Sequence, residues 1–227
     1  MARIRMSAFC VVLAVAGSTA ISGAAQDAKP KTLPVPEMGF FVTSVGSGRG
    51  GDLGGLEGAD KHCQELAEKV GAGKRVWHAY LSASPTANAP AVNAISRIGE
   101  GPWANAAGEV IARNTWELHD DVLNTIAYDS ALTEKGERLD PKVHSVMTGT
   151  LPNGKAFQAG GTATCNNWTS SDKGAVQVGH MDRKGDRTLP APNSWNSARQ
   201  VNSCSPQGLG EAEGQGLFYC FAQGLKK

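Results

Sequence analysis

The chain has 227 residues, and its 22 Lys and Arg against 21 Asp and Glu give a formal net charge of +1. This near balance gives no indication of a polyanionic partner such as a nucleic acid. The length suits a single domain with a core of ordinary size. The sequence contains no internal repeat, and its amino-acid composition does not change along the chain in a way that would indicate a second domain.

Residues 1–25 are predicted to be a secretory signal peptide. Arg3 and Arg5 form a basic start, residues 8–16 are apolar, and small residues follow up to a cleavage site predicted after Ala25, with Ala20 as the alternative. The apolar run is much shorter than the roughly 20 residues that a membrane-spanning helix needs. A secreted or periplasmic product with no membrane span is therefore expected, and cleavage would leave 20 basic residues against 21 acids.

The next segment, residues 26–37, is predicted to be a linker. It contains three prolines and few large apolar side chains, which is typical of an extended tail. Residues 38–227 are then expected to form the single domain.

Three elements are predicted in the first half of that domain. Residues 56–70 carry apolar side chains at steps of three and four, which indicates an amphipathic helix that ends at Gly71. Residues 75–82 (RVWHAYLS) are rich in aromatic and β-branched side chains, which favours a strand. A second, shorter helix is predicted over residues 91–98, where three apolar side chains would share one face.

The second half has a different character. Gly, Asn, Ser and Thr crowd between short apolar segments such as residues 143–147 and 217–221. This pattern predicts long loops held by a few strands.

Four cysteines remain after the predicted cleavage: Cys63, Cys165, Cys204 and Cys220. In an exported protein they most simply form two disulfides, for which three pairings are open. Each bridge would add about 3 to 5 kcal/mol to stability by the chain-entropy estimate. No two of them have the two-to-four-residue spacing that is typical of a zinc site, and there is no Cys-x-x-Cys redox motif.

Five segments resemble, in the same order, the segments of endostatin, the C-terminal domain of certain collagens and a member of the C-type lectin-like superfamily. They are residues 51–63 (GDLGGLEGADKHC) with 79–84 (AYLSAS), then 144–155 (HSVMTGTLPNGK), 164–170 (TCNNWTS), 203–204 (SC) and 217–221 (LFYCF). The resemblance implies an α+β, C-type lectin-like or endostatin-like fold with short twisted antiparallel strands, one or two helices and long loops stapled by disulfides. It also implies that Cys63 pairs with Cys220 and that Cys165 pairs with Cys204.

The resemblance does not extend to the calcium site of sugar-binding C-type lectins. Those proteins hold calcium with a Glu-Pro-Asn or Gln-Pro-Asp loop and a Trp-Asn-Asp strand, because oxygen ligands suit this hard ion. The nearest segments here are residues 191–193 (APN) and 195–197 (WNS), which lack both acids. Neither the zinc site nor the heparin-binding arginines of endostatin carry over, since no histidine precedes His62 and the arginines are scattered.

A polar cluster near the middle cysteines is the predicted ligand-binding site: Asn166, Asn167, Trp168, Trp195 and Asn196. An indole face can pack on the CH face of a sugar ring while amides bond its hydroxyls. The alternative is that both tryptophans are core residues and that the asparagines fix loop turns. Residues 167–169 also form a glycosylation sequon, which matters only on a eukaryotic secretory route.

Two groups of histidines and acids are candidate metal ligands. His119 precedes two aspartates, and His180 is followed by Asp182 and Asp186. Neither group has a complete ligand set at a recognisable spacing. We therefore predict no metal or cofactor, and neither calcium nor zinc has a full motif.

No catalytic residue is predicted. The serines lack the Gly-x-Ser-x-Gly setting of many hydrolases, and disulfides would leave no thiol for the oxidation carried out by the related formylglycine-generating enzymes. The expected function is that of a secreted, non-enzymatic module that binds a glycan or cell-envelope ligand. The alternative is a protein-binding or structural extracytoplasmic module without a small-ligand site.

Overall fold

The computed structural model describes residues 37–120, 123–158, 163–183 and 193–225. The predicted signal peptide and all of the predicted linker except Glu37 lie outside these residues. The described chain is an α+β domain with the elements β1 (Phe40–Val42), α1 (Gly55–Lys69), β2 (Arg75–Ala79), η1 (Ala94–Ser96), β3 (Trp103–Ala104), β4 (Val110–Ala112), α2 (Thr115–Leu118), β5 (Ser145–Met147), α3 (Cys165–Trp168), β6 (Val176–His180), β7 (Arg199–Val201), α4 (Pro206–Glu211) and β8 (Gly214–Leu225).

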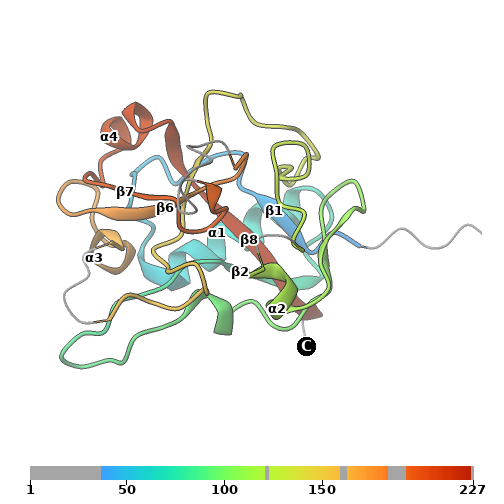
Figure 1. Cartoon of the computed structure of the whole chain (residues 1–227), viewed down its shortest axis with the longest axis horizontal. Helices are drawn as coiled ribbons and strands as arrows, with labels where there is room; N and C mark the ends of the chain where they lie inside the picture. The colour runs from blue at the N-terminus through green and yellow to red at the C-terminus, as the bar shows by residue number, and fades with distance from the viewer. Residues whose placement is uncertain (1–36, 121–122, 159–162, 184–192, 226–227) are drawn as a thin grey trace, which may run out of the picture. The chain divides into compact units, whose positions relative to one another are not determined.

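Strand β8 is the centre of the main sheet. The strand order is β1-β8-β5-β6-β7, and β2 also pairs with β8, which makes six strands. Figure 1 shows β8 crossing the middle of the molecule as a red arrow. Strands β1 and β2 run antiparallel to β8, but β5 runs parallel to it. The sheet is therefore mixed, and the expectation of antiparallel strands alone was wrong.

The side chains of β8 alternate between two hydrophobic clusters. Phe218, Cys220 and Ala222 belong to the cluster that includes the buried face of α1. Tyr219 and Phe221 point the other way, into a second cluster built largely from the loop-rich segments. This alternation is what the two-residue period of a strand requires when both faces of a sheet are covered. The sheet is thus buried on both sides.

Helix α1 confirms the predicted amphipathic helix, and β2 confirms the predicted strand that follows it. Ala59, Cys63, Leu66 and Ala67 form the buried face of α1. The helix begins after Gly54, whose positive φ of 75° suits a glycine. Beyond these elements, no helix among the described residues is long and apolar enough to cross a membrane.

The second predicted helix was wrong, because only the single turn η1 forms within residues 91–98. The backbone of Val92 instead exchanges two hydrogen bonds with Ala83, both of 2.9 Å. The side-chain oxygen of Asn93 accepts a hydrogen bond from the backbone N–H of Ala156 at 2.9 Å. Long-range partners thus satisfy the backbone in an extended form, and they outweigh a weak local helical pattern.

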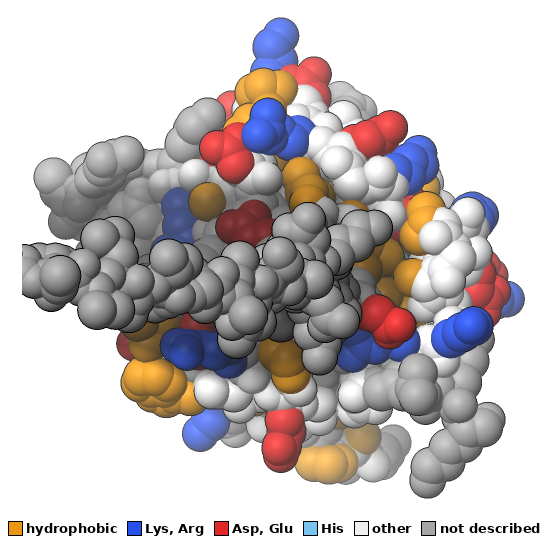
Figure 2. Space-filling model, turned by 90° about the vertical axis from the view of Figure 1, so that its right-hand side faces the viewer, with side chains coloured by type: hydrophobic (Ala, Val, Ile, Leu, Met, Phe, Trp, Pro, Cys, Tyr) orange, Lys and Arg blue, Asp and Glu red, His pale blue; other side chains and the backbone are white. Residues whose placement is uncertain are grey.

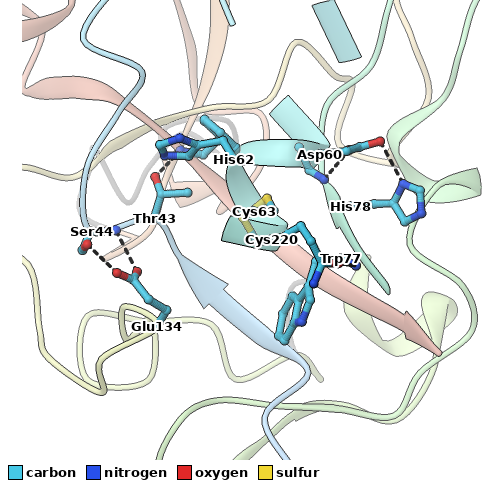
Figure 3. Close-up of a disulfide and its surroundings, with 12 residues drawn as sticks. Thr43, Ser44, Asp60, His62, Cys63, Trp77, His78, Glu134 and Cys220 are labelled. Carbon is cyan, nitrogen blue, oxygen red and sulfur yellow. Dashed lines mark hydrogen bonds and ion pairs between the residues drawn. A yellow bond between two sulfur atoms is a disulfide. The ribbon is translucent and has the colours of Figure 1, made fainter. Parts of the chain in front are cut away.

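Two disulfides fasten the domain. One joins Cys63 on α1 to Cys220 on β8, 157 positions apart, and the other joins Cys165 to Cys204, 39 positions apart. These are the pairs that the resemblance to endostatin implies. Figure 3 shows the first disulfide between the helix and the central strand. This bridge ties the first helix to the last strand of the described chain.

An ionic cluster lies beside the Cys63–Cys220 disulfide. Both carboxylate oxygens of Asp60 on α1 accept hydrogen bonds from Arg97 Nη2, at 2.8 and 2.7 Å. The same carboxylate contacts His78 Nδ1 at 3.0 Å, as Figure 3 shows, and accepts from the backbone N–H of Ala79 at 2.8 Å. Burial alone would raise the pKa of Asp60, but the hydrogen bond with His78 and the charge of Arg97 together lower it below its ordinary value. The cluster connects α1, β2 and the segment that follows η1.

Gly51 packs directly on the second disulfide, and we expect Gly51→Ala to destabilise the protein by about 1 to 3 kcal/mol through overpacking. A Cβ atom at this position would lie 2.4 Å from Cys165 Sγ and 2.6 Å from its Cβ, so the bridge would have to move. Urea unfolding followed by tryptophan fluorescence measures the loss. Gly210→Ala in α4 is the matched control, because no atom lies within 4 Å of its added Cβ. Equal midpoints for both variants would contradict the prediction.

Candidate functional site

The two tryptophans of the predicted ligand site are buried, each with 0% of its surface exposed. Trp168 packs in the cluster that contains α1, and its Nε1 donates a hydrogen bond to the Ser82 carbonyl at 2.8 Å. Trp195 packs in the opposite cluster, against Tyr80 and Tyr219. The structure therefore does not bring the two indoles together as a platform for a sugar. The alternative interpretation, that they are core residues, describes them correctly.

Asn166 and Asn167 form a turn. Both adopt left-handed backbone conformations, with φ of 54° and 53°, which asparagine tolerates better than most residues. The side-chain oxygen of Asn167 accepts from the Ser84 N–H at 2.8 Å, and its Nδ2 donates to the Ser84 carbonyl at 3.0 Å. Asn167 thus fastens a distant loop, and its sequon amide is already occupied. Asn166 is exposed and bonds Thr169 within the same turn.

Asn196, the last of the predicted residues, begins a buried chain of hydrogen bonds. Its Nδ2 donates to the Tyr80 hydroxyl at 2.9 Å, and that hydroxyl lies 2.7 Å from His119 Nε2. His119 Nδ1 lies 2.7 Å from the carbonyl of Thr115. A carbonyl can only accept, so Nδ1 carries a proton and donates it to Thr115.

The buried hydroxyl of Tyr80 stabilises this arrangement. Complete burial raises the pKa of Tyr80 far above its ordinary value, although the hydrogen bond from Asn196 opposes the shift. The hydroxyl therefore stays protonated and remains a hydrogen-bond partner of both Asn196 and His119. Both nitrogens of His119 have protein partners, so its ring is held in place between the core and the surface.

Helix α2, which supplies Thr115, presents a tryptophan to solvent. Asn114 caps the helix by accepting a hydrogen bond from the Glu117 N–H at 2.9 Å. Leu118 is buried, whereas Trp116 is 69% exposed. The two are separated by about 200° around a helix, so one anchors the turn in the core while the other faces outwards. Such exposure is unusual for an indole.

Trp116 borders a surface hollow of about 400 Å³. The residues that line it are Ile95, Thr115, Trp116, His119, Asp120 and Asn153. This volume lies within the usual range for small-molecule sites. One side is an indole and an aliphatic side chain, and the remainder offers a carboxylate, an amide and a hydroxyl. The hollow thus combines an apolar face with several hydrogen-bonding groups.

Trp116 is not among the site residues predicted from the sequence. The available signal was its position between the polar residues Thr115 and Glu117, two positions from the apolar Leu118. A one-turn helix is too short for a hydrophobic period to show which side faces the solvent. Two of the predicted residues connect to this hollow: Asn196 through Tyr80 and His119, and Trp195 through a ring contact with His119.

The histidine clusters do not form a metal centre in the described part of the chain. His144 contacts Asp182 at 3.2 Å through Nδ1 and Glu213 at 2.9 Å through Nε2, and its ring stacks on His180 with centroids 4.3 Å apart. Across the described ranges, no group of three or more His, Cys, Asp or Glu residues is arranged to hold a metal ion. Asp121 and Asp186 lie outside the described residues.

Comparison of the sequence with known protein families found no match, and no curated protein is similar to it. The assignment of a function therefore depends on the chemistry of the hollow beside Trp116.

Proposed function

We propose that this chain is a non-enzymatic, extracytoplasmic binding module that holds a sugar ring against Trp116. The observation that carries the proposal is an indole with 69% of its surface exposed at the edge of a hollow lined by polar groups. A ligand that covers the indole would remove apolar surface from water, at roughly 25 cal/mol for each Å².

The other lining groups suit a polyhydroxylated ligand. Asp120 and Asn153 each accept one backbone hydrogen bond within the protein, from Leu123 and Lys155, both at 3.1 Å. Hydroxyls of the ligand would bond the same carboxylate and amide while the CH face of the ring packs on the indole. The ring of His119 is held by Tyr80 and Thr115, so it forms a side of the hollow whose position is fixed. No calcium is needed for this mode of binding.

The setting of the site is consistent with secretion. Two disulfides are typical of proteins that mature outside the cytosol. The proposal places the domain in the C-type lectin-like superfamily, supported by a bridge between the first helix and the last strand and by a second bridge within the loop-rich half. The ligand would then be a glycan of the cell envelope or of the surroundings.

The test is a glycan-array screen of the oxidised protein, run with calcium and with a chelator. We expect hits that are independent of calcium and that Trp116→Ala weakens about tenfold or more, since an aromatic anchor commonly contributes over 1.4 kcal/mol. Val45→Ala is the matched control, because Val45 is 51% exposed but does not line the hollow.

Three results would count against the proposal. Hits that require calcium would indicate that the sugar binds at a metal site and not at the indole. Hits that survive Trp116→Ala would indicate that the sugar binds elsewhere on the protein. A screen without hits, together with a specific protein partner lost on Trp116→Ala, would make the exposed indole a protein-binding anchor.

A further inference from the structure

A second hollow, of about 520 Å³, lies where β1 and β2 begin. Its lining combines Glu37 and Met38, residues 70–72, Lys74, Arg75, Ala106 and residues 134–136. None of these residues lines the hollow beside Trp116. The second hollow is therefore a separate feature, and the proposed sugar site makes no use of it.

Arg75 is the residue of this lining that offers the most hydrogen-bond donors to a ligand. Its Nη1 donates a hydrogen bond to the Met38 carbonyl at 3.2 Å, and among the described residues it forms no ion pair. Burial lowers the pKa of Arg75, and the charge of Glu37 offsets this effect only in part. A guanidinium has five N–H donors, so most of this fork is left for a ligand.

The other charges of the lining favour an anion with a single charge. Lys74 and Lys135 are exposed and have no ion-pair partner in the described part of the chain. Both oxygens of Glu134 are taken by Ser44, at 3.0 Å from its N–H and 2.5 Å from its hydroxyl, as Figure 3 shows. Three cations against two carboxylates leave the lining with one excess positive charge.

The remaining lining is apolar. It consists of Met38, Val70, Ala72 and Ala106 together with Gly71 and Gly136, and Val70 is 40% exposed. Where described residues form the face in Figure 2, hydrophobic, acidic and basic side chains are interspersed. A surface of this kind does not select a polyanion, so a local anionic group on a partly apolar body fits better.

We propose that the hollow at Arg75 binds a small monocarboxylate that has an apolar body. The guanidinium would hold the carboxylate through two parallel N–H bonds, Lys74 and Lys135 would add attraction, and the apolar side chains would cover the body of the ligand. The single excess charge disfavours a dianion such as phosphate.

Isothermal titration calorimetry with N-acetylleucine as the probe tests this proposal in the oxidised protein. N-acetylleucinamide is the neutral counterpart of the probe, and inorganic phosphate is the dianionic one. We expect N-acetylleucine alone to bind, with a Kd below about 10 mM that weakens as salt is raised. We expect Arg75→Gln to weaken binding about tenfold or more.

Lys74→Gln and Lys135→Gln change exposed side chains, so they test the site even where Arg75→Gln does not fold. Each is expected to weaken binding about twofold to fivefold, whereas Lys61→Gln, which alters a surface pair with Glu65, should leave it unchanged. The proposal is overturned by absent binding, by equal binding of the amide, by tighter binding of phosphate, or by unchanged affinity in all three lining variants. Loss of sugar binding in Trp116→Ala bears only on the first site.

Discussion

Replacing both Cys63 and Cys220 with serine is expected to lower the free energy of unfolding by about 5 kcal/mol. The bridge closes a loop of 157 positions, and the entropy that such a closure removes from the unfolded chain grows with loop length. Domains of ordinary size have a total stability of about 5 to 15 kcal/mol, so this loss removes a large part of it. Urea unfolding of the wild type and the double variant measures the difference.

The paired replacement of Cys165 and Cys204 is the control for loop length. Its loop of 39 positions predicts a smaller loss, of about 4 kcal/mol. Both variants should be less stable than the oxidised wild type, in the order given by loop length. Unfolding midpoints of the oxidised and reduced wild type that coincide would show that the bridges do not stabilise the domain.

Asp60→Asn is expected to destabilise the protein by about 3 kcal/mol, because it leaves a nearly buried cation without its counter-ion. The Arg97 side chain is only 10% exposed and the Asp60 side chain 22% exposed, so water can replace little of the lost interaction. Asp52→Asn is the matched control, since its partner Arg49 is 59% exposed. A surface pair of that kind contributes about 1 kcal/mol or less. Equal losses in the two variants would contradict the expected role of the cluster.

The same cluster predicts how stability depends on pH. The pKa of Asp60 in the folded protein lies below its ordinary value of 3.8, so the folded state favours the ionised carboxylate. Its contribution is therefore complete above the unfolded-state pKa and is lost as the pH falls through the folded-state pKa. Urea unfolding at pH values from neutral to below 3.8 should show that Asp60→Asn lessens this acid destabilisation. An unchanged pH profile would assign the effect to other groups.

The sequence predicted correctly those elements whose formation depends on residues close together in the chain. The 3.6-residue period of α1 and the aromatic and β-branched run of β2 each lie within one continuous segment, and both elements form. The helix predicted over residues 91–98 failed because Ala83 and Gly154 bond backbone groups of this segment from outside it, and Ala156 bonds the Asn93 side chain. The parallel pairing of β5 with β8 likewise depends on contacts between segments that no local pattern reveals.

The candidate site was harder to predict for a related reason. Trp168 and Trp195 stand among polar residues in the sequence, as does Trp116, yet the first two are buried and the third is exposed. Their polar neighbours are satisfied by long-range bonds, such as those from Asn167 to Ser84 and from Asn196 to Tyr80. The composition around an indole therefore says little about its exposure, which is set by the packing of distant strands.

The position of β8 has a consequence for how this protein reaches its native state. Its strand partners β1, β2 and β5 all precede it in the sequence, so none of those ladders can form until residues 214–225 have left the ribosome. Folding that waits for such distant contacts is intrinsically slow. Until then only the ladders that do not include β8 can form, such as those of β3 with β4 and of β5 with β6. The order of the strands thus delays completion of the main sheet, and Cys63 lacks its native partner until Cys220 arrives.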